Sequence, residues 1–291
     1  MSRFRQESPD GAPCAEAGAE ALARFLERRP RLFVLTGAGC STASGIPNYR
    51  DPAGEWKHAR PVQYADFMAR HSVRQRYWAR SMVGWPRMAA AEPNRAHHSL
   101  TALQERGKVE RLVTQNVDGL HQKAGTEGVI DLHGRIDGVV CMACRLELSR
   151  ADWQAEVAAL NPVWERRIGT ASDRPDGDVD IAAADYAGFV VPPCPRCGGI
   201  VKPDVVFFGE AVPAGRVTEA KDALTAADAL LVVGSSLMVF SGFRFARHAA
   251  EADKPVVIVN RGRTRADALA ALKIDGDCGD VLGSVLALER V

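Results

Sequence analysis

Short apolar segments alternate with amphipathic segments along much of the chain. Apolar residues recur at three- and four-residue spacing between positions 15 and 28, which predicts a helix ending before Pro30. The apolar run from Leu32 to Thr36 follows and stops at Gly37, so we predict a buried strand that leads into a tight turn. The C-terminal part repeats this order, with strands predicted at 229–233 and 256–260 and helices near 217–227, 243–252 and 281–289.

This alternation indicates the fold class. Continuous apolar strands are buried on both faces, and helices between such strands make the sheet parallel. A further strand is predicted at 110–114, after a helix near 98–106, so the sheet takes strands from both ends of the chain. We therefore expect an α/β fold: a Rossmann-like parallel sheet with helices on both faces, plus a smaller inserted module.

Two stretches interrupt the alternation and are assigned to the inserted module. The chain has 291 residues, enough for about two structural units. The first stretch is helical and rich in Arg and Trp, and the second contains paired cysteines. The predicted division is a flexible N-terminus at 1–14, a Rossmann-like domain at 15–50, 92–135 and 203–291, and a small helical and zinc-binding module at 51–91 and 136–202.

Four of the seven cysteines form two C-x-x-C pairs, Cys141 with Cys144 and Cys194 with Cys197. Each pair can direct two thiolates at one ion, and two matched pairs favour a metal over the alternative, a redox dithiol. Four thiolates complete a tetrahedral zinc site and leave no position for substrate or water. The sequence therefore predicts one structural Zn²⁺ and places the chemistry elsewhere.

Composition and charge exclude several classes of protein. Lys and Arg number 37 and Asp and Glu 36, which gives a formal net charge of +1 and no general attraction to nucleic acid or membranes. The apolar runs are far shorter than the ~20 residues that cross a bilayer. The N-terminus lacks the pattern of a targeting peptide, so we expect a cytoplasmic protein with no nucleic-acid or membrane partner. The oligomeric state stays open, and a monomer is compatible with the sequence.

Small and polar residues follow the predicted strands. Gly37, Ala38 and Gly39 come after the first strand, where bare backbone N–H groups and a following helix N-terminus could hold a pyrophosphate. The third glycine of G-x-G-x-x-G is replaced by Thr42, so an ordinary glycine turn is an equally good interpretation.

Other strand ends carry amide, carboxylate and imidazole groups. Gln115, Asn116 and Asp118 lie just past a strand, where open α/β sheets bind ligands, although Asn116 to Gly119 also suits a plain type I turn. His133 lies in a polar loop and is the side chain type best suited to proton transfer near neutral pH, although a lone histidine is usually structural. Polar residues also follow the strands that end at Val233 and Val259.

The joint occurrence of these motifs resembles a known family. GAGCSTASGIP, TQNVDGLH, LHG, both C-x-x-C pairs, KPDVVFFGE, GSS and VNRG occur in this order. Together they resemble the sirtuins, Sir2-like NAD-dependent protein deacylases, over nearly the whole chain from about Ala15. RQRYWARSMVGWP and KPDVVFFGE look most like class II, the class of an animal mitochondrial sirtuin. Two positions depart from the family: Cys40 stands where many sirtuins have Ile, and Asn48 where the motif has Asp.

The resemblance implies NAD⁺ as a cosubstrate that is cleaved at its nicotinamide–ribose bond. The Ala38 loop would hold the diphosphate and nicotinamide ribose, Asn116 and Asp118 the carboxamide, and the later strand ends the adenosine. The implied NAD-binding residues are Gly37, Ala38, Gly39, Tyr49, Arg50, Gln115, Asn116, Asp118, Gly234, Ser235, Ser236, Asn260, Arg261, Gly262 and Cys278.

The resemblance also implies the catalytic and substrate residues. His133 would act as general base on the ribose hydroxyls, with Asn116 as the second catalytic residue, and the products would be nicotinamide, free lysine and O-acyl-ADP-ribose. Tyr77 and Arg80 match a Tyr-x-x-Arg that grips acyl carboxylates in desuccinylating sirtuins, which predicts a preference for longer or acidic acyl groups. Acyl-lysine proteins would pair by strand addition with 205–210 and 236–239. The implied substrate residues are Tyr77, Arg80, Val205, Phe207, Phe208, Gly209 and Glu210.

Three functions other than deacylation make different demands on the sequence. Protein mono-ADP-ribosyl transfer would use the same NAD site with a different nucleophile, and the sequence does not separate it from deacylation. An inactive NAD or ADP-ribose binding module would be expected to lack His133 or Asn116, and both are present. A zinc-ribbon nucleic-acid binder is disfavoured by the balanced charge.

Overall fold

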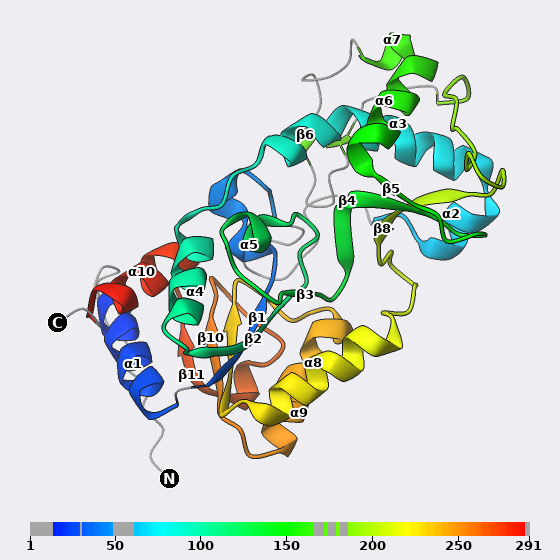
Figure 1. Cartoon of the computed structure of the whole chain (residues 1–291). Coiled ribbons are helices and arrows are strands. Elements are labelled where there is room, and N and C mark those ends of the chain that lie inside the picture. Colours follow the sequence, from blue (N-terminus) through cyan, green and yellow to red (C-terminus); the bar gives the residue numbers. More distant parts are fainter. Residues whose placement is uncertain are drawn as a thin grey trace.

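The structure is a computed structural model that describes residues 14–29, 31–48, 61–165, 172–173, 179–180 and 186–288 (Figure 1). Its larger part is built on a sheet of six parallel strands in the order β11-β10-β9-β1-β2-β3. The strands are β1 Leu32–Thr36, β2 Val109–Thr114, β3 Ile130–Asp131, β9 Ala229–Val233, β10 Val256–Val259 and β11 Ala270–Ile274.

The strand order creates a switch point beside β1. The chain runs outward from β1 through β2 to β3, and then returns to the other side of β1 to add β9, β10 and β11. Ligands of open α/β sheets bind in a crevice outside the carboxyl ends of the strands at such a point. The sheet topology therefore directs attention to the loops that follow β1 and β9.

Helices cover both faces of this sheet, and alternate residues of β1 face the two layers. Leu32 and Val34 pack in one core, whereas Phe33 and Leu35 pack in the other. The first layer contains α1 Cys14–Arg28, α4 Arg95–Glu105 and α10 Cys278–Leu288, and the second contains α8 Ala214–Ala226 and α9 Phe240–Glu251. The predicted Rossmann-like fold class is confirmed.

Several predicted boundaries and elements differ from the structure. The predicted helices near 243 and 281 begin at Phe240 and Cys278. The start of α9 has no side-chain N-cap that would mark it in the sequence. The short edge strands β3 and β11 were not predicted. β3 is two residues long, and β11 is only partly buried and contains Lys273.

The smaller module combines a three-stranded antiparallel sheet with helices. The sheet has the order β5-β4-β8, and α3 lies beside it with α6 (Figure 1). The core of this module includes Trp78 and Trp153, whose rings lie 5.3 Å apart. The remaining elements are α2 Tyr64–Ala69, α3 His71–Ala90, β4 Gly134–Cys141, β5 Glu147–Ser149, α6 Arg150–Leu160, α7 Pro162–Glu165, β6 Ser172–Asp173, β7 Val179–Asp180 and β8 Val201–Val205.

The buried Arg150 side chain links helices α6 and α3 of the module. The Arg150 guanidinium at the start of α6 lies 4.8 Å from the Trp85 ring centroid and donates to the carbonyl and hydroxyl of Ser81 on α3. The division of the chain into domains at the predicted boundaries stays a prediction. No helix within the described ranges is long and apolar enough to span a membrane.

Candidate active site

The loops after β1 and β9 touch backbone to backbone. The Gly37 amide donates to the Val233 carbonyl at 3.1 Å, and the Gly39 amide donates to the Gly234 carbonyl at 2.8 Å. A Cβ at Gly234, whose φ is +63°, would lie 2.3 Å from the Cys40 nitrogen, so only glycine fits there. The small residues are therefore required by the close approach of these loops.

The predicted helix after this glycine turn is not observed. Two single-turn 3₁₀ helices, η1 Ala38–Cys40 and η2 Thr42–Ser44, follow β1 instead. The N-terminus of a long helix therefore does not follow β1, and the Gly37 and Gly39 amides donate to carbonyls after β9. Tyr49 and Arg50, which were predicted to contact NAD, lie outside the described residues.

The loop after β2 is hydrogen-bonded to the loop after β1. Asn116 Nδ2 donates to the Gly37 carbonyl and to Ser41 Oγ, both at 3.0 Å. The Ser41 hydroxyl in turn donates to Asp118 Oδ2 at 2.7 Å, and the pKa of Asp118 is raised by burial. Gln115 Nε2 donates to Ser235 Oγ at 2.7 Å and so reaches the β9 loop. The structure thus gathers these residues at one edge of the sheet.

His133 stands beside this group with a defined tautomer. Its Nδ1 lies 2.9 Å from the Gln115 carbonyl oxygen, which can only accept, so Nδ1 carries the proton. Nε2 is then the basic nitrogen, and it lies 2.7 Å from Ser241 Oγ on α9. Burial lowers the pKa of His133, and Arg244 and Arg216 lower it further, while the bond to Gln115 opposes the shift. The neutral ring that results is competent to accept a proton.

The residues predicted to contact adenosine lie at the carboxyl ends of β9 and β10 and at the start of α10. Asn260 Nδ2 donates to the Arg261 carbonyl at 2.8 Å, and Arg261 pairs with Asp277 at 3.4 Å. Cys278 is buried, which raises its pKa to about 12 and keeps it a neutral thiol. Gly234, Ser235, Ser236 and Gly262 lie in the same loops. Their roles toward NAD stay predictions.

The predicted substrate residues come from β8, the segment after it, and α3. The Tyr77 ring of α3 packs against Phe207, with ring centroids 5.2 Å apart. Glu210 Oε2 accepts from the Phe207 amide at 2.8 Å and pairs with the buried Lys202 ammonium at 3.1 Å, which holds the 205–210 segment in a tight bend. Arg80 lies three residues beyond Tyr77 on the same helix face and is half-buried.

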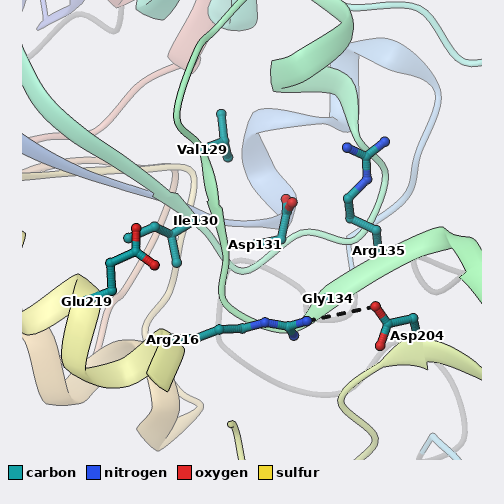
Figure 2. A pocket seen from close by; sticks show the side chains of 8 residues that line it. All are labelled: Val129, Ile130, Asp131, Gly134, Arg135, Asp204, Arg216 and Glu219. Atoms are coloured by element: carbon teal, nitrogen blue, oxygen red, sulfur yellow. Dashed lines mark ion pairs between the residues drawn. The ribbon is translucent and has the colours of Figure 1, made fainter. Parts of the chain in front are cut away.

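A cavity of about 240 Å³ lies beside the loop that carries His133 (Figure 2). Across it, Arg216 of α8 pairs with Asp204 of β8 at 3.8 Å. A Cβ at Gly134, whose φ is +79°, would lie 2.0 Å from the Asp204 carbonyl oxygen, so the residue after His133 must be glycine. The cavity therefore lies between the loop that carries His133 and strand β8, which leads into the 205–210 segment. Its lining is Val129, Ile130, Asp131, Gly134, Arg135, Asp204, Arg216 and Glu219.

The four cysteines of the two C-x-x-C pairs converge in the smaller module. Their sulfur atoms all lie within 4.8 Å of one another. Two of the separations are short: 3.5 Å for Cys141 to Cys197 and 3.7 Å for Cys144 to Cys194. Sulfurs at about 2.3 Å from a tetrahedral zinc lie roughly 3.8 Å apart, so the cluster matches a zinc site.

A second group of possible ligands, Cys40, His97 and His121, lies buried behind the β1 loop. The backbone N–H of Asn94 donates to His97 Nδ1 at 3.2 Å, so the neutral His97 ring carries its proton on Nε2. Burial lowers the pKa of His97 to about 4, which keeps the ring neutral. His97 therefore presents no lone pair to an ion, and we assign this group to the core.

Comparison with known proteins agrees with the geometry. The model of the Sir2 family matches residues 37–241, a range that includes the crevice loops, His133 and all four clustered cysteines. The chain belongs to the Sir2 family. This sirtuin is 56% identical over 268 residues to an NAD-dependent protein deacetylase of Bordetella bronchiseptica, covering 92% of this chain and 97% of that one. It is 45% identical over 288 residues to the NAD-dependent protein deacylase Sirt4 of Drosophila melanogaster, covering 97% and 91%.

Solved sirtuin structures share the fold. A Sir2 enzyme bound to an acetylated peptide matches with a TM-score of 0.75 at 28% identity, covering 93% of this chain and 98% of that one. A Sir2 enzyme with a p53 peptide and NAD⁺ matches with a TM-score of 0.73 at 29% identity, with the same coverage. The likeness therefore spans both the parallel sheet and the smaller module.

Proposed function

We propose that this sirtuin is an NAD-dependent protein lysine deacylase that releases nicotinamide and an O-acyl-ADP-ribose. The observation that carries the proposal is the neutral His133, whose Nδ1 lies 2.9 Å from the carbonyl oxygen of Gln115, the residue that precedes Asn116 after β2, which leaves Nε2 as the basic nitrogen. Its Nδ1–H is fixed by a carbonyl, so the ring can take a proton and hold the charge. The deacetylase and deacylase names of its relatives support the same chemistry.

The polar side chains gathered at the ends of β1 and β2 support NAD⁺ binding at the switch point. Gly37 and Gly39 have no room for a Cβ, which would lie 2.7 Å and 2.9 Å from atoms of the β9 loop. These short distances show that both glycines serve the contact between the two loops, and the Gly37 and Gly39 amides already donate to the Val233 and Gly234 carbonyls. We propose that Gly37 to Gly39 hold the diphosphate, that Asn116 and Asp118 hold the nicotinamide carboxamide, and that Gly234, Ser235, Asn260 and Cys278 line the adenosine side.

The direct experiment is to incubate the pure chain with NAD⁺ and a panel of acyl-lysine peptides, and to follow the products by mass spectrometry. The proposal expects nicotinamide, free lysine and O-acyl-ADP-ribose in equal amounts. NAD⁺ consumption that modifies an unacylated protein would instead favour mono-ADP-ribosyl transfer. No consumption of NAD⁺ with any peptide would contradict both.

The acyl preference can be tested on α3. We propose that Arg80 receives the terminal carboxylate of an acidic acyl group, on the helix face that it shares with Tyr77, whose ring packs against Phe207. Arg80→Met should lower kcat/KM for glutaryl-lysine by about 10- to 100-fold, the value of a charge-assisted hydrogen bond, and change acetyl-lysine turnover far less. Arg76→Met, which removes an exposed arginine from the same helix, is the matched control. Equal losses on both substrates, or a wild type that prefers acetyl-lysine, would exclude the carboxylate clamp.

The pH dependence follows from the environment of His133. Burial favours the neutral ring, so its pKa lies below the ordinary value of 6.5. The base is therefore already deprotonated at neutral pH, and protonation removes its activity only in acid. We expect kcat/KM to stay level near neutrality and to fall with a one-proton slope whose midpoint lies below 6.5. A midpoint at or above that value would show that His133 is not the titrating base.

A further inference from the structure

Both ring nitrogens of His133 are occupied in the structure. Because Nδ1–H donates to the Gln115 carbonyl, the Ser241 hydroxyl must donate its own proton to Nε2, at 2.7 Å. Ser241 belongs to the first turn of α9 and is 8% exposed. A proton that reaches His133 must therefore either displace this hydroxyl or pass through it.

We propose that Ser241 Oγ carries the proton from the reacting ribose hydroxyl to His133. The ribose hydroxyl proton moves to Ser241 Oγ while the proton of Ser241 moves to His133 Nε2. The ribose oxygen keeps the electron pair of its broken O–H bond and uses it to attack the acyl carbon. The serine remains a neutral hydroxyl, and the imidazolium keeps its Nδ1–H bond to the Gln115 carbonyl. This inference rests on the proposed deacylase function and adds a residue to it.

The packing of α9 favours transfer through the serine over its displacement. A Cβ on the neighbouring Gly242 would lie 2.3 Å from Gln115 Oε1, so the first turn of α9 is pressed against the loop that also fixes the His133 ring. Rotation of Ser241 away from His133 would leave a largely buried hydroxyl without this hydrogen bond, which is unfavourable. Transfer through the hydroxyl keeps both hydrogen bonds at every stage.

The charges around His133 are compatible with this path. Arg216 on α8 and Arg244 on α9 both disfavour the imidazolium, and the Gln115 carbonyl stabilises it. The nearby Asp131 accepts from Gln122 Nε2 with both carboxylate oxygens, at 3.0 Å and 2.9 Å. The two arginines thus favour the neutral ring before the reaction, the Gln115 carbonyl stabilises the ring once it is protonated, and Ser241 is the hydroxyl in contact with its basic nitrogen.

The test compares Ser241→Ala with Ser241→Thr, which keeps a hydroxyl, and with Ser284→Ala on the remote helix α10. For Ser241→Ala we expect deacylation kcat to fall about 10- to 100-fold. KM for NAD⁺ and exchange of labelled nicotinamide should stay within about twofold, because breaking and re-forming the nicotinamide–ribose bond removes no proton from a ribose hydroxyl. Ser241→Thr should recover most of the rate, and Ser284→Ala should match the wild type.

A second readout needs neither NAD⁺ nor peptide. The ¹⁵N NMR signal of Nε2 in the neutral His133 ring should move in Ser241→Ala relative to the wild type, because the Nε2 lone pair loses the hydrogen bond that the hydroxyl donates. An unchanged Nε2 signal would overturn the hydrogen bond, and a Ser241→Ala enzyme as fast as the wild type would overturn the proton transfer. If the signal moved in Ser241→Ala while the wild type deacylated no peptide, that combination would count against the proposed function and not against the Ser241–His133 contact.

Discussion

His133→Ala is expected to keep NAD⁺ binding while deacylation falls by about 10²- to 10⁴-fold, the usual contribution of a general base. The imidazole touches the protein through the Gln115 carbonyl and the Ser241 hydroxyl, and neither contact belongs to the glycine loops that would hold the diphosphate. Removing the ring therefore removes the proton acceptor and leaves the backbone of the crevice between β1 and β9 in place.

Calorimetry with NAD⁺ and a peptide turnover assay separate these two effects. The control is His98→Ala, which removes an exposed histidine on α4, away from the candidate site. If NAD⁺ binding disappeared together with activity in His133→Ala, the ring would be a structural element of the crevice, and its assignment as base would be wrong.

Loss of the zinc site should unfold the smaller module. Structural zinc contributes about 10–16 kcal/mol in small zinc-binding peptides at neutral pH, more than the total stability of many domains. Cys141 is at the end of β4, and Cys194 and Cys197 lie in the turn before β8, so the metal would tie the two strands together. Cys194→Ala should lose the metal and the packing of this module, and should lower activity indirectly.

The tryptophans make the zinc prediction simple to measure. Four of the five tryptophans, Trp78, Trp85, Trp153 and Trp164, lie in or against the core of the smaller module, so their fluorescence reports on this part of the chain, and Trp56 lies outside the described residues. Metal analysis should give one zinc per chain, and Cys194→Ala should shift tryptophan emission to the red, whereas Cys14→Ala should not. A stable fold with much less than one metal per chain would exclude the structural zinc.

The features that sequence predicted well depend on local patterns. β1 and β9 are continuous apolar runs, and the structure begins and ends both strands at the predicted residues. The cysteine cluster could be predicted from spacing, because each C-x-x-C pair is a local turn. Gln115 and Asn116 could be placed near Gly37 because parallel strands end at the same edge of a sheet.

The features that sequence did not predict depend on contacts between distant segments. Ser241 meets His133 across 108 positions, and no spacing rule connects a serine in the first turn of α9 with a histidine after β3. The bond from Ser41 to Asp118 is of the same kind, spanning 77 positions. The 3₁₀ turns after β1 arise because the β9 loop presses on Gly39, a constraint that the local sequence does not contain.

The central place of β1 in the sheet bears on the order in which the protein can fold during synthesis. β1 is made early, at Leu32–Thr36, yet one of its two neighbours is β9, which is complete only at Val233. The core of the smaller module, by contrast, draws its buried residues from Ile46 to Phe207. The ribosome has therefore supplied every buried residue of the module before the first strand of the parallel sheet has both of its partners. β1 must wait for about two hundred residues of chain, and during that interval one edge of an apolar strand has no partner within the sheet.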